Sequence, residues 1–162
     1  MNGVGLRTEK ALVDWLAAQD WSSSLLGTPS CLTSYGKGAF NDPDLEDVMP
    51  SFPRIVVKAM NASAIFPSDK SSEIDVTATL QVSADDSTEP QILSIVEIFD
   101  NLMQYICIDG NASVLNATDS NESGPFTAMF AIPADLGSSD TSDRARIFPR
   151  SVTIFAAANS QP

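Results

Sequence analysis

The chain has 162 residues, of which 43% are hydrophobic, and a formal net charge of −12. This length suits one domain with a substantial core, and the composition excludes a disordered chain. With a pI of about 4.1 the chain lacks the basic surface of nucleic-acid binders, and it has no apolar run of the roughly 20 residues that a membrane helix needs. We therefore expect one globular domain over residues 1–162, with no membrane or directly bound DNA as partner.

The first third of the chain predicts one helix and two strands. The first ten residues contain no apolar segment of the secretory kind, so we expect synthesis in a cytoplasm. Apolar residues at helical spacing predict a helix over Arg7–Asp20, and Cys31–Tyr35 predicts a short strand. A long polar loop, Gly36–Phe52, follows. The continuous apolar run of Phe52–Met60 is typical of a central strand.

The middle of the chain carries the clearest periodic patterns. Apolar and polar residues alternate strictly over Glu73–Ala84, which predicts a strand with one face in the core. Thr88 and Gln91 form a capping box, with Pro90 in the first turn of the helix that follows. The expected apolar face of that helix, which runs to Cys107, consists of Ile92, Leu93, Val96, Phe99, Leu102, Met103 and Ile106.

The last third predicts two more strands separated by polar loops. Asn111–Gly124 and Pro133–Asp143 are the loops, and Phe126–Ile132 and Ala145–Ala157 are the strands. Pro149 predicts a bulge or an edge position in the last strand. The resulting order, α-β-β-β-α-β-β, indicates an α+β fold with a single, mostly antiparallel (mixed) β-sheet and two helices packed on one face.

The residues offer little for catalysis or metal binding. The chain has no histidine, which removes the commonest general base and metal ligand. A pair of carboxylates remains as an alternative for hydrolysis. Asp42, Asp44 and Glu46 resemble the start of a calcium loop, but Asp47 stands where that loop requires glycine. We therefore expect no enzyme activity, no catalytic residue, no metal site and no cofactor.

The two cysteines, Cys31 and Cys107, match no zinc or redox spacing. Cys107 ends an apolar helical pattern, where a buried free thiol is the usual case. A disulfide between the two residues is the alternative that the sequence leaves open.

The order of these elements and their residue patterns resemble those of a family of phage proteins. The features that carry the resemblance are the N-terminal helix, the Pro-Arg-Ile-Val-Val strand over Pro53–Val57, the alternating strand, the aliphatic helix over Ile92–Ile106 and the final strand, Arg144–Ala157, with its arginines and proline. Together they resemble the tail-terminator and tail-completion (head–tail joining) proteins of long-tailed bacteriophages. No single residue motif carries the resemblance.

The resemblance implies a virion structural protein without catalytic residues. Such a protein forms a hexameric ring that caps the tail tube, so its partners are copies of itself, the tail tube protein and the neck or connector proteins. DNA would only pass through the lumen, whose acidic wall would repel it. The alternatives are a head-closure, neck or minor capsid protein of the same kind of particle, or a soluble binding module outside any virion.

Aromatic and arginine side chains carry most of the binding energy in protein interfaces, and they supply our candidate contacts. For the aromatic residues the alternative is core packing. For the arginines it is pairing with carboxylates of the same chain. The candidate interface residues are Trp15, Trp21, Phe40, Phe52, Arg54, Arg144, Arg146 and Arg150.

Overall fold

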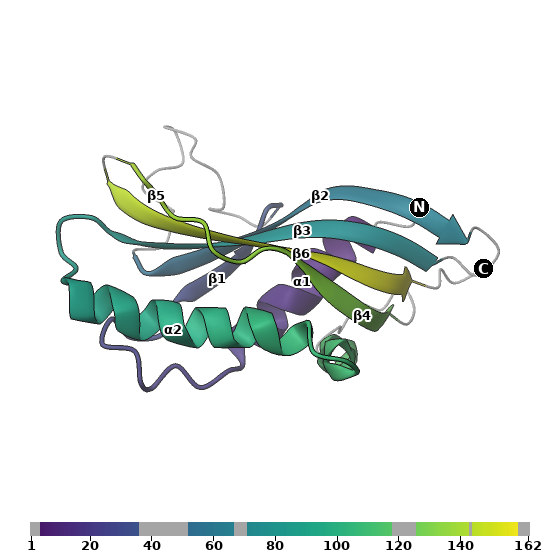
Figure 1. Cartoon of the computed structure of the whole chain (residues 1–162), viewed down its shortest axis with the longest axis horizontal. Helices are drawn as coiled ribbons and strands as arrows, with labels where there is room; N and C mark the ends of the chain where they lie inside the picture. The colour runs from purple at the N-terminus through teal and green to yellow at the C-terminus, as the bar shows by residue number, and fades with distance from the viewer. Residues whose placement is uncertain (1–3, 36–51, 67–70, 118–125, 143, 159–162) are drawn as a thin grey trace.

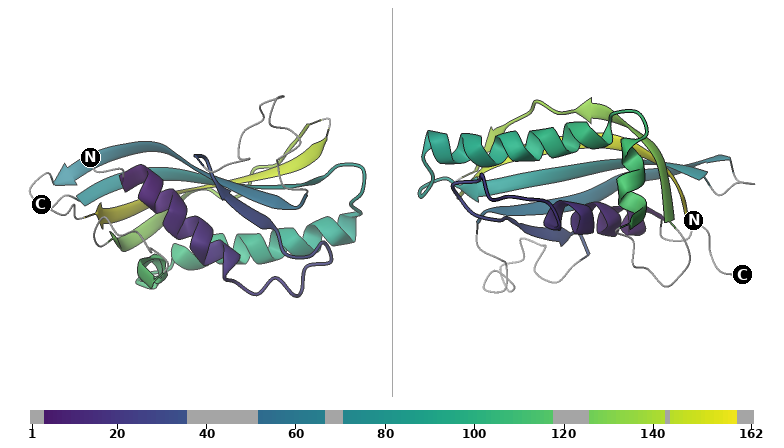
Figure 2. Two further views of the ribbon diagram at one scale, coloured as in Figure 1. Left: turned by 180° about the vertical axis from the view of Figure 1, so that it is seen from behind. Right: turned by 90° about the horizontal axis from the view of Figure 1, so that it is seen from below.

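A computed structural model describes residues 4–35, 52–66, 71–117, 126–142 and 144–158. The predicted loop Gly36–Phe52, with Phe40, Asp42, Asp44 and Glu46, lies outside these residues except for Phe52. Both long helices lie on the same side of one twisted sheet (Figures 1 and 2). No helix within the described ranges is long and apolar enough to cross a membrane. The predicted α+β class, with its mixed and mostly antiparallel sheet, is confirmed.

Six strands form the sheet in the order β1-β2-β3-β6-β4, and β5 pairs with β6 beyond the end of β4. Among the strands of the described residues, β1 and β2 run parallel and all other pairs are antiparallel. The elements in chain order are α1 (Val4–Ala17), β1 (Ser30–Thr33), β2 (Arg54–Phe66), β3 (Ser71–Ser83), α2 (Glu89–Ile106), the 3-10 helix η2 (Asn111–Ala117), β4 (Phe126–Asp135), β5 (Asp140–Thr141) and β6 (Ala145–Ala158).

Strand β3 is the centre of the sheet, as its strict alternation predicts. Its apolar side chains point toward the helices and are at most 1% exposed, whereas the side chains between them lie on the other face and are only half-buried or exposed. This apolar row meets matching rows on β2 and β6 and forms the floor of the core. The residues of the row are Ile74, Val76, Ala78, Leu80 and Val82.

Helix α2 covers this floor and begins as predicted. The Thr88 hydroxyl accepts a hydrogen bond from the Gln91 amide, and the Gln91 side chain accepts one from the Thr88 amide. The expected apolar face is partly wrong. Leu93 is 56% exposed, and Ile95 lies fully buried beside Phe99. The apolar positions of this helix are so numerous that the sequence does not show which side faces the sheet.

Helix α1 begins three residues before the predicted start and ends at Ala17 rather than Asp20. Its end is set by a side chain, because the indole Nε1 of Trp21 donates to the carbonyl oxygen of Leu16 at 2.9 Å. A carbonyl of the last turn is thereby satisfied, and the chain leaves the helix axis. Ala17, the last residue of the helix, is exposed.

The carboxylate of Glu9, which is 1% exposed, joins α1 to two strands. Its Oε1 atom accepts a hydrogen bond from the Ser34 amide at 2.8 Å, and its Oε2 atom accepts one from the Ala59 amide at 3.1 Å. Strand β1 ends at Thr33, so the Ala59 amide has no neighbouring strand in the described chain on that side. Glu9 takes the place that the next residue of β1 would have had.

Strand β2 runs on to Phe66, six residues beyond the predicted end, because it pairs with β3 along its whole length. It is central only at its start, where β1 pairs with Arg54–Val57. The continuous apolar run at its start is explained by this local burial, whereas the following residues, from Lys58 on, lie at the edge of the sheet.

Of the two positions predicted for Pro149, the structure shows no bulge against β3 but a local edge on the other side of β6. Strand β6 is internal, and Pro149 pairs with Thr79 without a register shift. On the other side of β6, the pairing with β5 ends at Ile147 and the pairing with β4 begins at Ser151. Pro149 lies in the gap between these two pairings. Its missing amide hydrogen therefore costs no ladder hydrogen bond.

We predict that Glu9→Ala lowers the free energy of unfolding by about 2 kcal/mol, because it leaves two half-buried backbone amides without their acceptor. Glu9→Gln should cost less, since its amide oxygen still accepts one of the bonds. Urea denaturation measures both. As a control, Asp14→Asn breaks the exposed Lys10–Asp14 ion pair of the same helix and should cost less than about 1 kcal/mol. Equal losses for all three variants would contradict the structural role of Glu9.

Candidate functional site

The two tryptophans proposed as contacts lie in the core, which is the alternative that the sequence left open. Trp15 is 6% exposed and Trp21 is 2% exposed. The Trp15 ring stacks on Tyr105 of α2, with 6.2 Å between the ring centroids. The Trp15–Tyr105 pair joins the two helices, and neither tryptophan presents much surface to a partner.

Arg150 is also internal, and its partner is a carboxylate of the same chain, as the alternative foresaw. Its guanidinium donates from Nε to Asp100 Oδ1 at 2.5 Å and from Nη2 to Asp100 Oδ2 at 3.3 Å. Its Nη1 atom donates to the carbonyl oxygen of Ser138 at 2.5 Å. Arg150 thus ties β6 to helix α2 and to the segment between β4 and β5.

The other three arginines among the candidate contacts, Arg54, Arg144 and Arg146, lie at one end of the sheet, which we call the arginine end. Arg54 pairs with Gln81 and Arg146 with Val82, and the carbonyl oxygen of Arg144 accepts from the amide of Ala84 at 3.1 Å. Gln81 faces away from the helices and Val82 toward them. Arg54 and Arg146 therefore lie on opposite faces of the same end.

Phe52 lies beside the arginine end and packs on Arg54. The Arg54 guanidinium carbon is 4.4 Å from the centroid of the Phe52 ring, and its Nε atom donates to Gln81 Oε1 at 2.6 Å. Partial burial lowers the pKa of the Arg54 guanidinium from its ordinary value. The Phe52 ring and Gln81 together hold the Arg54 guanidinium in place.

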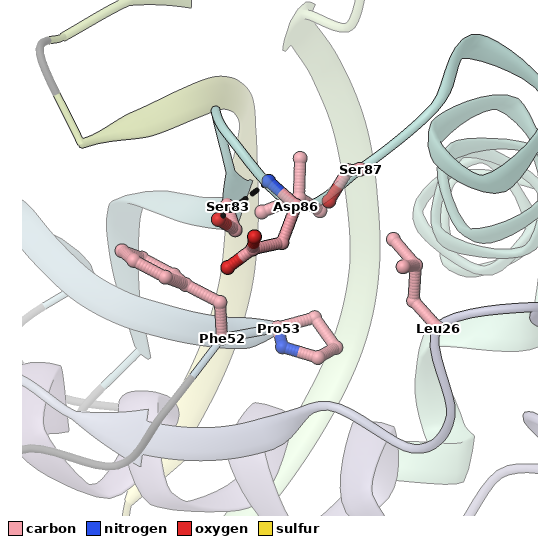
Figure 3. A pocket seen from close by; sticks show the side chains of 7 residues that line it. Leu26, Phe52, Pro53, Ser83, Asp86 and Ser87 are labelled. Carbon is pink, nitrogen blue, oxygen red and sulfur yellow. Dashed lines mark hydrogen bonds between the residues drawn. The ribbon is translucent and has the colours of Figure 1, made fainter.

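A small pocket opens next to Phe52 (Figure 3). Its volume is about 240 Å³, below the roughly 300–1,000 Å³ of small-molecule sites. The Asp86 carboxylate lies at its rim, while the Asp86 amide donates to Ser83 Oγ at 3.2 Å. The pocket combines an apolar wall with one acidic side chain. The lining residues are Leu26, Phe52, Pro53, Val82, Ser83, Asp86 and Ser87.

The sheet face that points away from the helices, here called the open face, has a polar centre. The hydroxyl oxygens of Thr77 and Ser151 are hydrogen-bonded at 2.9 Å, and Thr153 donates to Asp75 Oδ1 at 2.8 Å. These cross-strand pairs satisfy one another. The centre of the open face is therefore polar and offers few groups that need a partner.

An apolar patch lies beside this polar centre and was not among the predicted contacts. We call Phe130, Ile132 and Phe155 the open-face patch. The rings of Phe130 and Phe155 stack with centroids 4.2 Å apart, yet Phe130 is 45% exposed and Ile132 is 47% exposed. A register shift between Ala128 and Phe130 changes the alternation along β4. The sequence indicates the strand, but not which of its apolar residues lies outside.

The described residues contain no group of three or more histidine, cysteine, aspartate or glutamate side chains positioned to hold a metal ion. Cys31 and Cys107 are free thiols, so the alternative of a disulfide between them is wrong. Burial raises the pKa of the Cys31 thiol to about 12 and also raises that of Cys107. At neutral pH both thiols are therefore protonated and poor nucleophiles.

Comparison with known proteins finds chains of similar fold but identifies no family. No family model matches the chain, and no curated protein matches it. Nine chains of solved structures do match. One of them, whose name says nothing of its function, has a TM-score of 0.51 and 13% sequence identity, over 94% of this chain and 92% of that chain. At this identity the likeness concerns the fold alone.

We predict that Arg150 contributes to the stability of the fold and that Arg146 does not. Arg150→Ala should lower the free energy of unfolding by about 2 kcal/mol, because it leaves Asp100 and the Ser138 carbonyl without their donor. Arg146→Ala, at an exposed position, should change it by less than about 0.5 kcal/mol. Chemical denaturation of both variants checks this difference. A large loss for Arg146→Ala would show that it too is structural.

We predict that both cysteines of the folded chain react slowly with a thiol reagent at pH 8, because their raised pKa values keep the thiolate fraction small. Two thiols per chain should react quickly once the protein is unfolded in urea. A spectrophotometric thiol assay measures both rates. Finding no reactive thiol in urea would indicate a disulfide and contradict the structure.

Proposed function

We propose that this chain is a virion structural protein, a tail-terminator-like ring subunit that caps the tail tube and joins it to the neck or head connector. The observation that supports this most is the open-face patch, because exposed aromatic and aliphatic side chains in one cluster are typical of protein interfaces. The predicted order of the elements, which suggested the family, agrees with the order of the two long helices and the five longer strands, and the structure adds η2 and the short strand β5 in segments predicted as loops.

A closed ring needs two different complementary surfaces on each subunit. The two edges of the sheet are such surfaces, and the open-face patch and the arginine end, on other parts of the sheet, are left for contacts with tail and neck proteins. The net charge of −12 is compatible with a ring through which DNA passes, since a wall of like charge does not hold the duplex. In this proposal the protein does no chemistry, and it acts by contact with copies of itself and with tail and neck proteins.

The alternatives are a head-closure, neck or minor capsid protein of the same kind of particle, and a binding module outside any virion. Sedimentation velocity and negative-stain imaging of the purified chain separate these classes. The proposed function predicts six-fold rings with a central opening, formed alone at high concentration or on the end of a tail tube. A protein that stays monomeric under both conditions would contradict the proposal and favour a binding module.

We predict that Ile132→Asp weakens ring formation or binding to the tail tube, because it places a charge in a surface that loses water on contact. The matched control is Leu93→Asp, which adds the same charge at a similarly exposed position on α2, away from the open face. Sedimentation velocity and pelleting with tail tubes measure the effect. Equal effects of the two variants would exclude the open-face patch as the contact.

A further inference from the structure

We infer that copies of this chain join head to tail by an antiparallel pairing between the exposed edge of β2 in one copy and the exposed edge of β4 in the next. The inference rests on the proposed function, because it names the contact that would close the ring. It concerns the edges of the sheet rather than its open face.

The first of these edges begins where β1 stops. Strand β1 pairs only with Arg54–Val57, and Glu9 takes the amide of Ala59. From Lys58 to Ala62, no strand of the described chain pairs with this side of β2. A shallow hollow of about 260 Å³ lies below the edge, between β2 and the first turns of α1. Two of its lining residues, Leu6 and Met60, are 49% and 56% exposed.

The second edge is the outer side of β4, the last strand of the sheet order. Near its start, Asn116 Oδ1 accepts a hydrogen bond from the Ala128 amide at 2.6 Å. Within the described ranges, no strand lies on the outer side of β4 between Met129 and Asp135. Met129 is 42% exposed and Ile132 is 47% exposed, so this edge is apolar as well.

The directions of β2 and β4 allow these strands to pair antiparallel between two copies. Strand β2 is antiparallel to β3, β3 to β6, and β6 to β4, so β4 runs antiparallel to β2. Two copies placed side by side, with their helices on the same side of the sheet, therefore bring β4 of one against β2 of the other in an antiparallel pair. The contact joins two different surfaces, so it repeats around an axis, as a ring requires.

The charges at the two edges are complementary in this arrangement. Lys58 is the first residue of β2 beyond β1, and Asp135 is the last residue of β4. An antiparallel pairing places the start of one strand beside the end of the other, and so brings Lys58 near Asp135 of the next copy. Both side chains are exposed in the single chain. Hydrogen bonds from Ser138 and from the Gly137 amide lower the pKa of Asp135, which keeps it ionised.

Charge reversal tests this contact. Lys58→Glu and Asp135→Lys should each weaken self-association about tenfold or more at low salt, because each places like charges together at every contact. An equimolar mixture of the two variants should assemble as well as the native chain. When the two variants alternate, every contact pairs opposite charges, because the two substituted positions meet at one contact and the two native residues meet at the next. Lys10→Glu, on the exposed side of α1, is the matched control and should assemble normally.

Sedimentation velocity of each variant and of the mixture gives the result, with thermal unfolding as a check on folding. Amide hydrogen exchange of the native chain is a second measurement that needs no substitution. It should show slower exchange at residues 60–62 on assembly. If native rings form but the single variants assemble like the control, or these amides stay unprotected, the inference is wrong and the proposed function is not affected. If the native chain does not associate at all, both fail.

Discussion

The carboxylate of Glu9 accepts hydrogen bonds from two backbone amides, one directly after β1 and one in β2, and the position of α1 on the sheet depends on this contact. The carboxylate lies in the core side of the molecule, where an unsatisfied amide or an unpaired charge would be costly. By binding Ser34 and Ala59 it fixes helix α1 against β1 and β2, and it sets the point at which β1 gives way to an exposed edge. One side chain therefore fixes the position of α1 on the sheet and marks the point at which the edge of β2 becomes exposed.

The fold was predicted well where the pattern was local. The alternation of β3 and the capping box of α2 each depend on a few consecutive residues, and both lie where the sequence indicated. The errors arose where distant contacts decide. The end of α1 depends on the Trp21 indole, and the length of β2 depends on its pairing with β3. Such contacts leave no mark in the spacing of nearby residues.

The candidate site was only partly predictable, and residue type alone did not separate surface from core. Arginine and tryptophan are common in interfaces, but Trp21 and Arg150 serve the interior here. Phe130 and Ile132 reach the surface because β4 shifts register next to them. Arg54, Arg146 and Phe52 do lie at one end of the sheet, although they are far apart in the sequence, and Arg54 and Arg146 lie on its opposite faces. Only the strand register places them at the same end.

The burial of both tryptophans has a practical consequence for spectroscopy. Trp15 belongs to α1 and Trp21 follows it, and both are screened from water, so their emission reports the integrity of the helix layer. The open-face patch contains phenylalanine and isoleucine, which contribute almost nothing to fluorescence excited at tryptophan wavelengths. Tryptophan fluorescence can therefore follow unfolding of the chain, and it should change little when another molecule contacts the open face.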